Sequence, residues 1–409
     1  KCIPAQTLNT KNQTPRSSFI VHRSSFIIPY SMALQMVDLQ TQYQRIRSDI
    51  DREMQEVLET SMFIGGPKMT AFREKLEAYL GVKHVIPCAN GTDALQIAMM
   101  ALGLQPGDEV IVPAFTYVAT AEVIGLLGLV PVMTDVDPET FNITAAHIEA
   151  AITPRTKAIV PVHLFGQSVD MEPILALAEK HGLYVIEDNA QAIGADYTFA
   201  NGTVVKTGAM GHFGCTSFFP SKNLGCYGDG GALMTNDDDL ALAARMIANH
   251  GQSRQYYHDK IGVNSRLDAL QAAILNVKLP HLDTYNASRR GAALYYDSVF
   301  SNIAGLKVPG RQHNSTHVFH QYTLRLEGGP ARRDALKAWL QERGIPAMIY
   351  YPVPLYKQGA FAHWWAGGTL PVTEQLCDSV FSLPMHSELN EGVLKQITDA
   401  VQKFMEQNI

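Results

Sequence analysis

Short, continuously apolar runs alternate with helical patterns through the first half of the chain. The runs do not alternate between apolar and polar residues, as a strand with one wet face would, so we expect both faces of each strand to be covered. This pattern predicts a mostly parallel sheet between two layers of helices, an α/β fold. The expected strands are His84–Cys88, Glu109–Pro113, 158–164 and Tyr184–Asp188.

Polar and small residues follow these strands at the points where they end. In open α/β sheets, ligands bind outside the carboxyl ends of the strands. We therefore expect the strand-end residues to converge on one ligand. We interpret His163 as a hydrogen-bonded structural residue rather than a base. The strand-end residues are Gly91, Thr92, Thr116, Tyr117, His163 and Asp188.

A lysine in a loop of small residues indicates the chemistry of that ligand. Lys222 lies five residues after Ser217 and shortly before the glycine-rich stretch 228–231. A surface charge or a phosphate clamp is the alternative reading, and Asp188 alone could be a helix N-cap. Together they predict pyridoxal 5'-phosphate. Lys222 would bond to its aldehyde, Asp188 would keep its pyridine nitrogen protonated, and Ser217 would help to bind its phosphate.

Four more residues complete the predicted cofactor site. Gln191 lies three residues after the strand-end aspartate and could reach the phenolic oxygen of the ring. Gly91 and Thr92 open a helix, whose N-terminus favours a phosphate, although a plain N-cap would look the same. Tyr117 is the candidate ring to stack on the cofactor, with Phe115 as the alternative.

Composition narrows the class of protein. The 409 residues are 46% hydrophobic, and the net charge is −6 with no long basic run, which argues against nucleic acid or an anionic membrane as a partner. No apolar stretch approaches the roughly 20 residues that span a bilayer. Five scattered cysteines without a C-x-x-C pair argue against a disulfide framework or a metal site. We expect a cytoplasmic protein.

Three segments are expected along the chain. Residues 1–31 carry a direct repeat that resembles no domain and are interpreted as a disordered extension, with Met32 as the natural start; a targeting or membrane-docking arm is the alternative. Residues 32–286 should form an N-terminal segment and the large cofactor-binding domain. Residues 287–409 should form a smaller α+β C-terminal domain, with one long helix from Arg266 to about Phe300 leading into it.

These motifs, in this order, resemble the DegT/DnrJ/EryC1/StrS family of sugar aminotransferases, which are pyridoxal phosphate enzymes of fold type I. The resemblance implies a homodimer with active sites at the interface, where Asn264 would reach the phosphate of the partner's cofactor. It runs from about Val37 to near the C-terminus. It rests on Gly91-Thr-Asp-Ala-Leu, Pro113-Ala-Phe-Thr-Tyr-Val-Ala-Thr, His163-Leu-Phe-Gly, Glu187-Asp-Asn-Ala-Gln, Ser217-Phe-Phe-Pro-Ser-Lys-Asn-Leu-Gly and Gly262-Val-Asn-Ser-Arg-Leu-Asp.

Within the family, the lysine and Gly-Val-Asn-Ser-Arg motifs look most like those of enzymes that aminate UDP-linked 3-keto sugars, above all UDP-2-acetamido-2-deoxy-3-oxo-glucuronate aminotransferase, with glutamate as amino donor. That resemblance makes Arg266 a candidate contact for a substrate carboxylate, with an interface salt bridge as the alternative. Those relatives carry His-Tyr before a proline, where this chain has Tyr350 and Tyr351. The two tyrosines are candidate substrate contacts, and their departure from the pattern leaves a different sugar open.

The resulting expectation is amino transfer from glutamate to C3 of a UDP-linked keto sugar, in the synthesis of nucleotide sugars for polysaccharides. A C4 keto sugar or a dTDP carrier is the alternative. A sugar dehydratase that uses pyridoxamine phosphate is disfavoured, because the resemblance implies that such enzymes carry histidine at this position, whereas this chain has Lys222. A non-catalytic regulator would need a further module, and a dehydrogenase would need a G-x-G-x-x-G after the first strand.

Overall fold

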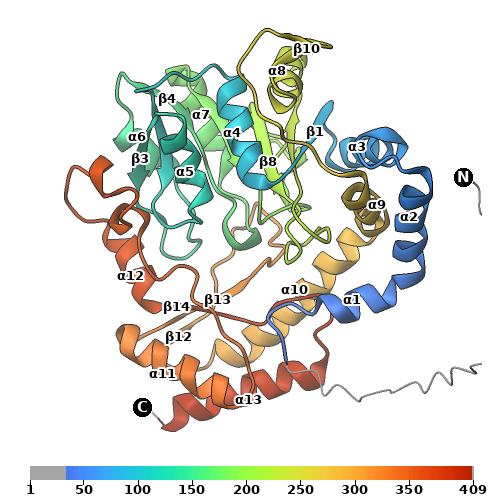
Figure 1. Cartoon of the computed structure of the whole chain (residues 1–409). Coiled ribbons are helices and arrows are strands. Elements are labelled where there is room, and N and C mark those ends of the chain that lie inside the picture. Colours follow the sequence, from blue (N-terminus) through green and yellow to red (C-terminus); the bar gives the residue numbers. More distant parts are fainter. Residues whose placement is uncertain (1–33, 408–409) are drawn as a thin grey trace, which may run out of the picture. The chain divides into compact units, whose positions relative to one another are not determined.

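The central sheet has seven strands in the order β1-β9-β8-β5-β4-β2-β3 (Figure 1). The computed structural model describes residues 34–407, so the extension expected at residues 1–31 lies outside the described residues. Four pairings, β2 with β3, β2 with β4, β4 with β5 and β5 with β8, are parallel. The strands are β1 (His84–Cys88), β2 (Glu109–Pro113), β3 (Val130–Thr134), β4 (Thr156–Ile159), β5 (Tyr184–Asp188), β8 (Phe213–Ser217) and β9 (Gly231–Thr235).

One strand runs against the others. β9 pairs antiparallel with β8 on one side and with β1 on the other. Because β1 and β8 are both antiparallel to β9, β1 has the same direction as β8 and the other parallel strands. The predicted mostly parallel α/β sheet is confirmed, with β9 as its single reversed member. Nothing in the hydrophobic pattern indicates that reversal.

Helices cover both faces of the sheet, which explains the continuous apolar runs. In β2, Val110 and Val112 pack with α4 (Gly91–Ala101), α5 (Ala119–Leu126) and α8 (Asp238–Ala248). The intervening Ile111 packs on the opposite face with α6 (Ala145–Ala151) and α7 (Met171–His181). On that same face α3 (Gly66–Leu80) and α9 (Ala269–Lys278) cover β1 and β9. Strand residues therefore meet apolar partners whichever way they point.

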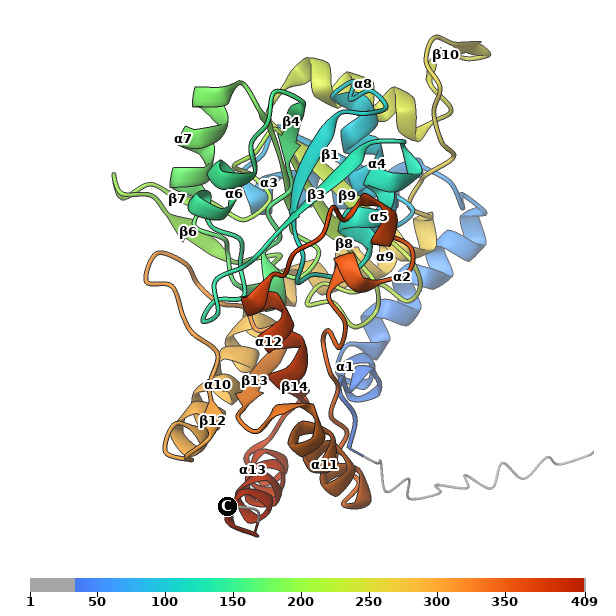
Figure 2. The same cartoon turned by 90° about the vertical axis from the view of Figure 1, so that its left-hand side faces the viewer.

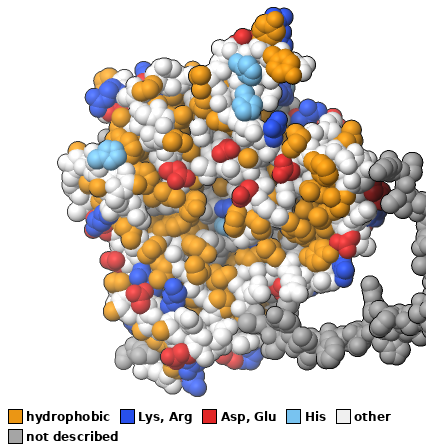
Figure 3. All heavy atoms as spheres, in the orientation of Figure 1, with side chains coloured by type: hydrophobic (Ala, Val, Ile, Leu, Met, Phe, Trp, Pro, Cys, Tyr) orange, Lys and Arg blue, Asp and Glu red, His pale blue; other side chains and the backbone are white. Residues whose placement is uncertain are grey.

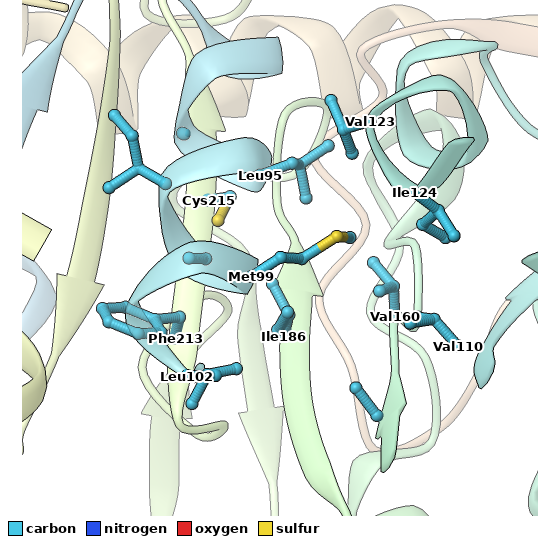
Figure 4. Packing of buried hydrophobic residues seen from close by; sticks show 14 of the residues in the cluster. Leu95, Met99, Leu102, Val110, Val123, Ile124, Val160, Ile186, Phe213 and Cys215 are labelled. Atoms are coloured by element: carbon cyan, nitrogen blue, oxygen red, sulfur yellow. The ribbon is translucent and has the colours of Figure 1, made fainter. Parts of the chain in front are cut away.

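The packing below α4 and α5 is dense and almost wholly apolar (Figure 4). Met99 of α4 lies beside Ile186 of β5, and Leu95 of α4 packs in the same cluster, to which α5 contributes Val123 and Ile124. All five side chains are buried. This layer fixes the N-terminus of α4 against the carboxyl ends of the strands.

The C-terminal part builds a second hydrophobic core on a three-stranded antiparallel sheet, β12-β13-β14. Figures 1 and 2 both place α11 and α13 beyond that small sheet, away from the seven-stranded one. This architecture agrees with the expected smaller α+β part. Its elements are α10 (Leu282–Phe300), β12 (Leu306–Lys307), β13 (Tyr322–Leu326), α11 (Gly329–Glu342), α12 (Pro371–Ser379), β14 (Val380–Leu383) and α13 (Glu391–Gln407).

The long helix expected from Arg266 to about Phe300 is divided, so that prediction was wrong in its details. α9 ends at Lys278, a 3-10 turn with a proline follows at η2 (Leu279–His281), and α10 then begins. Proline lacks the N–H that a continuous helix needs. Leu282 packs in the core of the large part, whereas Phe300 packs in that of the small part. The predicted boundary at 286/287 falls inside α10 and stays a prediction.

The N-terminal elements join the two cores. Residues 34–38 and α1 (Leu39–Arg45) contact the small part: the Met385 N–H donates to Met36 O at 3.2 Å, and Arg45 pairs with Glu388 at 2.7 Å. α2 (Arg47–Thr60) then leads to α3. The remaining elements are short, namely η1 (Leu164–Gly166), β6 (Asp196–Thr198), β7 (Val204–Lys206), β10 (Gln252–Arg254), β11 (Tyr257–His258), η3 (Leu355–Lys357) and η4 (Ala362–Trp364).

Candidate active site

Lys222 lies in the loop that follows β8. Its N–H donates to Phe219 O at 2.8 Å, so a tight turn presents the side chain, and that side chain is only partly accessible to solvent. Burial lowers the pKa of the Lys222 amine to about 8, although the charge of Asp188 acts in the opposite direction. A large part of the amine is therefore neutral, and nucleophilic, at mildly alkaline pH.

Asp188 is held at the carboxyl end of β5 by two hydrogen bonds. Thr120 Oγ1 donates to Asp188 Oδ2 at 2.7 Å, and the Ala190 N–H donates to Asp188 Oδ1 at 3.2 Å. Its backbone bonds to Pro161 O and to the His163 N–H, which ties β5 to the end of the neighbouring strand. Both partners stabilise the carboxylate, which suits a group meant to face a protonated ring nitrogen.

Thr120 was not predicted from the sequence. It is fully buried near the start of α5, three residues after Tyr117, and its hydroxyl orients Asp188. Nothing in its spacing distinguishes it from an ordinary helix threonine. The signal that could have found it is the strand order. Only β4 separates β2 from β5, so a helix that follows β2 can begin near the carboxyl end of β5.

Gln191 has a fixed orientation. Its Oε1 accepts from the Phe165 N–H at 2.8 Å, so its amide nitrogen is identified, and Nε2 donates to the hydroxyl of Tyr351 at 3.1 Å. An amide nitrogen carries two protons. One N–H therefore remains for a further acceptor, and contact with the cofactor's phenolic oxygen stays a prediction.

The predicted phosphate cup, formed by Gly91, Thr92 and Ser217, is closely packed. Asn90 caps α4 by accepting from the Asp93 N–H at 2.8 Å, which leaves the first N–H groups of Gly91 and Thr92 to other acceptors. A Cβ at Gly91 would lie 2.8 Å from the Ser217 Cβ. Glycine is therefore what allows the start of α4 to approach Ser217, so that the free N–H groups of the helix and the Ser217 hydroxyl lie close enough to bind one anion.

His163 lies deep in the same region but both of its ring nitrogens are engaged. Nδ1 accepts from the Val169 N–H at 3.1 Å, so the proton of a neutral ring is on Nε2, which lies 2.9 Å from Glu187 Oε2. Glu187 also accepts from three backbone N–H groups, those of Gly208, Met210 and Gly211. This geometry agrees with the structural interpretation of His163.

The aromatic residues separate into core and surface. Phe115 is buried among Phe141, Phe165 and Tyr351, whereas Tyr117 is 55% exposed with its ring centroid 6.2 Å from that of Tyr351. Tyr117 therefore keeps a free face at the end of β2. Stacking on the cofactor stays a prediction for it, and the position of Phe115 in the core speaks against the alternative.

The predicted substrate and partner contacts lie in two places. Tyr350 and Tyr351 precede η3 and border the Lys222 loop region, where Tyr351 bonds to Gln191 and Tyr350 lines a cavity with Ser221. Asn264 and Arg266 are exposed. They flank Ser265, whose hydroxyl accepts from the Ala89 N–H at 3.0 Å, just before the start of α4. The roles of all the predicted site residues stay predictions.

These residues fit pyridoxal phosphate. The desolvated Lys222 amine can bond to the cofactor, and the oriented Asp188 carboxylate can face its ring nitrogen. The N-terminus of α4, which lies close to Ser217, can bind its phosphate. No group of three or more metal-ligating side chains gathers anywhere within residues 34–407. None of the helices in that range is long and apolar enough to cross a bilayer.

The lowered pKa of Lys222 can be measured in the cofactor-free protein. Competitive labelling with acetic anhydride, read by peptide mass spectrometry, should show labelling of Lys222 that rises as pH approaches 8 and levels off above it, because the protonated amine does not react. Replacement of Asp188 by Asn should move the midpoint to lower pH, since that carboxylate raises the pKa. A midpoint near the ordinary lysine value of about 10.4 would contradict the desolvation argument.

A methyl group at Gly91 should open the phosphate cup. Gly91→Ala places a carbon against Ser217, so α4 must move away, and we expect the Kd for pyridoxal phosphate to rise at least about tenfold in a titration of the cofactor-free protein. Gly291→Ala is the matched control, because Gly291 lies in α10 with no atom within 4 Å of the added carbon. Equal Kd values for pyridoxal phosphate in the two variants would show that the close contact between Gly91 and Ser217 does not affect cofactor binding.

Comparison with known proteins gives the family. Residues 44–402 match the DegT/DnrJ/EryC1/StrS aminotransferase family. UDP-2-acetamido-2-deoxy-3-oxo-D-glucuronate aminotransferase of Pseudomonas aeruginosa is 48% identical, covering 90% of this chain and 99% of the relative. A pleiotropic regulatory protein of Geobacillus stearothermophilus and UDP-N-acetyl-3-dehydro-alpha-D-glucosamine 3-aminotransferase of Acidithiobacillus ferrooxidans are each 47% identical, both over 91% of this chain and over 99% and 98% of their own lengths.

The fold comparison agrees. The crystal structure of S. venezuelae DesV in complex with a ketimine intermediate superposes with a TM-score of 0.87 at 38% identity, covering 91% of this chain and 99% of that one. Both the sequence match and the fold match extend over nearly the whole chain. The protein belongs to the DegT/DnrJ/EryC1/StrS aminotransferase family.

Proposed function

We propose that this aminotransferase uses pyridoxal phosphate to move an amino group from glutamate to the C3 keto group of a UDP-linked sugar. The observation that carries the proposal is the desolvated Lys222 amine beside Asp188 and the N-terminus of α4. The reaction type and the C3 position follow the names of two relatives at 47–48% identity over most of the chain. Function in nucleotide-sugar synthesis for polysaccharides, in the cytoplasm, belongs to the same proposal.

The cofactor, when bound, supplies a conjugated ring that delocalises the negative charge left when a proton leaves the carbon next to nitrogen. Asp188, oriented by Thr120, holds a proton at the ring nitrogen. Lys222 provides the attachment point and then, with its amine free and a pKa of about 8, accepts and returns the proton at that carbon. Gly91, Thr92 and Ser217 bind the phosphate and so fix the ring relative to the amine.

We further propose a homodimer in which Asn264 and Arg266 complete the partner's site. Both are exposed, and the β10–β11 hairpin beside them presents Tyr256, which is 83% exposed. Hydrophobic side chains also gather at the right of Figure 3, where Figure 1 places α2 and α3. The exposed apolar residues of that region are Leu58, Met62, Phe63 and Ile64, and such groups favour a partner surface.

Two kinds of alternative function remain, namely amination of a different sugar nucleotide and regulation without catalysis. A C4 keto sugar or a dTDP carrier would use the same residues; relatives at 38–40% identity include dTDP-sugar transaminases and a GDP-perosamine synthase. Tyr350 and Tyr351, together with Arg266, are where the sugar would be selected. One relative is named a pleiotropic regulatory protein. A regulator without catalysis is disfavoured, because it would not need a lysine whose pKa is lowered to about 8.

The function is tested by incubating the holoenzyme with glutamate and a panel of UDP- and dTDP-linked 3-keto and 4-keto sugars, with mass spectrometry of the products. We expect amination of a UDP-linked 3-keto sugar, and a loss of at least about a thousandfold in Lys222→Ala. Lys180→Ala, which removes a lysine whose side chain is 63% exposed on α7, is the control and should keep full activity. Steady turnover in Lys222→Ala would contradict the assigned role.

Shared active sites predict complementation between two inactive variants. Lys222→Ala lacks the amine of its own site, and Asn264→Ala lacks the contact to its partner's site. Mixed by refolding or co-expression, half of the dimers contain one intact site, so we expect about a quarter of wild-type activity. Sites built from one chain would leave the mixture no more active than its parents. Light scattering of the wild type gives the assembly size independently.

A further inference from the structure

A cavity of about 320 Å³ adjoins the Lys222 loop. Four polar or aromatic residues line it, namely Ser221, His320, Gln321 and Tyr350. The rest of the lining comes from the N-terminal segment and from the end of β14 and the residues after it, and the lining contains no lysine, arginine, aspartate or glutamate. These other residues are Gln35, Met36, Val37, Leu39, Leu383 and Met385.

His320 lines this cavity and has a ring nitrogen without a partner. The residue is 7% exposed, and within residues 34–407 its Nδ1 is buried without a hydrogen-bond partner. Burial, together with the charges of Lys222 and Arg289, holds the pKa of His320 well below its usual value, so the ring is neutral. A neutral imidazole offers one donor and one acceptor. His317, three residues earlier, differs because its Nδ1 accepts from the Phe319 N–H at 3.0 Å.

Gln321 contributes a second unused polar atom. Its Oε1 is also buried and lacks a partner within the described range. Buried polar atoms without partners are uncommon because leaving water is unfavourable for them. Two such atoms on consecutive residues that line one cavity indicate that a polar ligand or an ordered water belongs there.

The backbone of the segment 317–321, which carries His320 and Gln321, is held by a buried arginine and contains a residue with positive φ. Arg289 Nη1 donates to three carbonyl oxygens, those of Phe319, His320 and Met385, at 3.1, 3.2 and 2.9 Å. Phe319 has a φ of +46°, in the left-handed region that a phenylalanine rarely adopts. Such a conformation persists only where its surroundings hold it, and it is commonest at functional sites.

Gly166 holds the same segment from the side of the large sheet. The Val318 N–H donates to Gly166 O at 2.8 Å, and a Cβ at Gly166 would lie 2.9 Å from the backbone nitrogens of Phe319 and His320. The His320 ring is therefore placed by Arg289, by the turn at Phe319 and by contact with Gly166. Three independent restraints on one backbone segment indicate that the position of its side chains matters.

We propose that His320 and Gln321 form a specificity subsite that hydrogen-bonds the hydroxyl groups of the sugar substrate beside Lys222. The inference rests on the proposed function and adds the part of the substrate that this cavity holds. A hydroxyl both donates and accepts, as a neutral imidazole and an amide do. A carboxylate of the amino donor or a diphosphate is disfavoured, because the lining offers no cation and Arg289 already donates to three carbonyls.

Binding of two probes to the holoenzyme, measured by calorimetry, tests the subsite without turnover. UDP-N-acetylglucosamine carries the hydroxyls of its hexose, which UDP lacks, and both probes share the uridine diphosphate. The wild type should bind the first more tightly than the second. His320→Leu and Gln321→Met should each raise the Kd for UDP-N-acetylglucosamine roughly three- to tenfold, as expected for one lost hydrogen bond, and so shrink the difference between the probes. His320→Asn, which keeps a donor and an acceptor, should recover part of it.

Gln312→Met is the matched control. Gln312 Oε1 is likewise buried without a partner in the described range, but it does not line this cavity, so its removal should leave both Kd values unchanged. Thermal melting and cofactor absorbance check that each variant is folded, and Gln321→Met keeps the test open if His320→Leu is not. Wild-type-like Kd values in both cavity variants would mean that the cavity holds water only, and would overturn the inference.

The outcomes separate this inference from the proposed function. If the wild type aminates a UDP-linked keto sugar but the cavity variants bind UDP-N-acetylglucosamine as the wild type does, the subsite is wrong and the function stands. If the wild type aminates none of the sugars and does not prefer UDP-N-acetylglucosamine to UDP, both are wrong. Loss of affinity in the two cavity variants, with Gln312→Met unchanged, supports both.

Discussion

Removal of water from one amine governs the chemistry of this site. Lys222 lies where burial favours the neutral form, while Asp188 partly restores the charge, and the balance gives a pKa of about 8. A higher value would leave the amine protonated and unreactive, and a much lower one would make it a poor proton acceptor. The sheet produces this balance because its apolar faces are covered by helices, so polar groups can gather only at the carboxyl ends of its strands.

The small C-terminal part completes the site rather than merely enclosing it. Tyr351 orients Gln191, and the segment 317–321 is fixed to the large part through Gly166 and to α10 through Arg289. The N-terminal segment closes the same region by its bond from Met385 to Met36. The proposed cofactor contacts thus come mainly from the large sheet, whereas the residues proposed to select a sugar come mainly from the small part. That division suits a family in which one reaction is applied to many sugars.

Much of the fold and cofactor site could be predicted from the sequence, because both depend on local patterns. Continuous apolar strands followed by small or polar residues indicated Gly91 and Asp188, and the loop of Lys222 was indicated by the serine before the lysine and the glycines after it. The reversed β9 could not be predicted, since parallel and antiparallel buried strands have similar compositions. Thr120, His320 and Gln321 were missed because their roles depend on contacts between distant segments. The division of the predicted long helix had a visible signal in Pro280, which the helical periodicity of its flanks outweighed.

The proposed chemistry depends on a covalent bond between the amine at position 222 and the cofactor. Sodium borohydride reduction of the resting holoenzyme, followed by proteolysis and peptide mass spectrometry, detects that bond. We expect a phosphopyridoxyl group on the peptide that contains Lys222, with loss of the visible absorbance on reduction. An unlabelled Lys222, or a label on another lysine such as the buried Lys278, would contradict it.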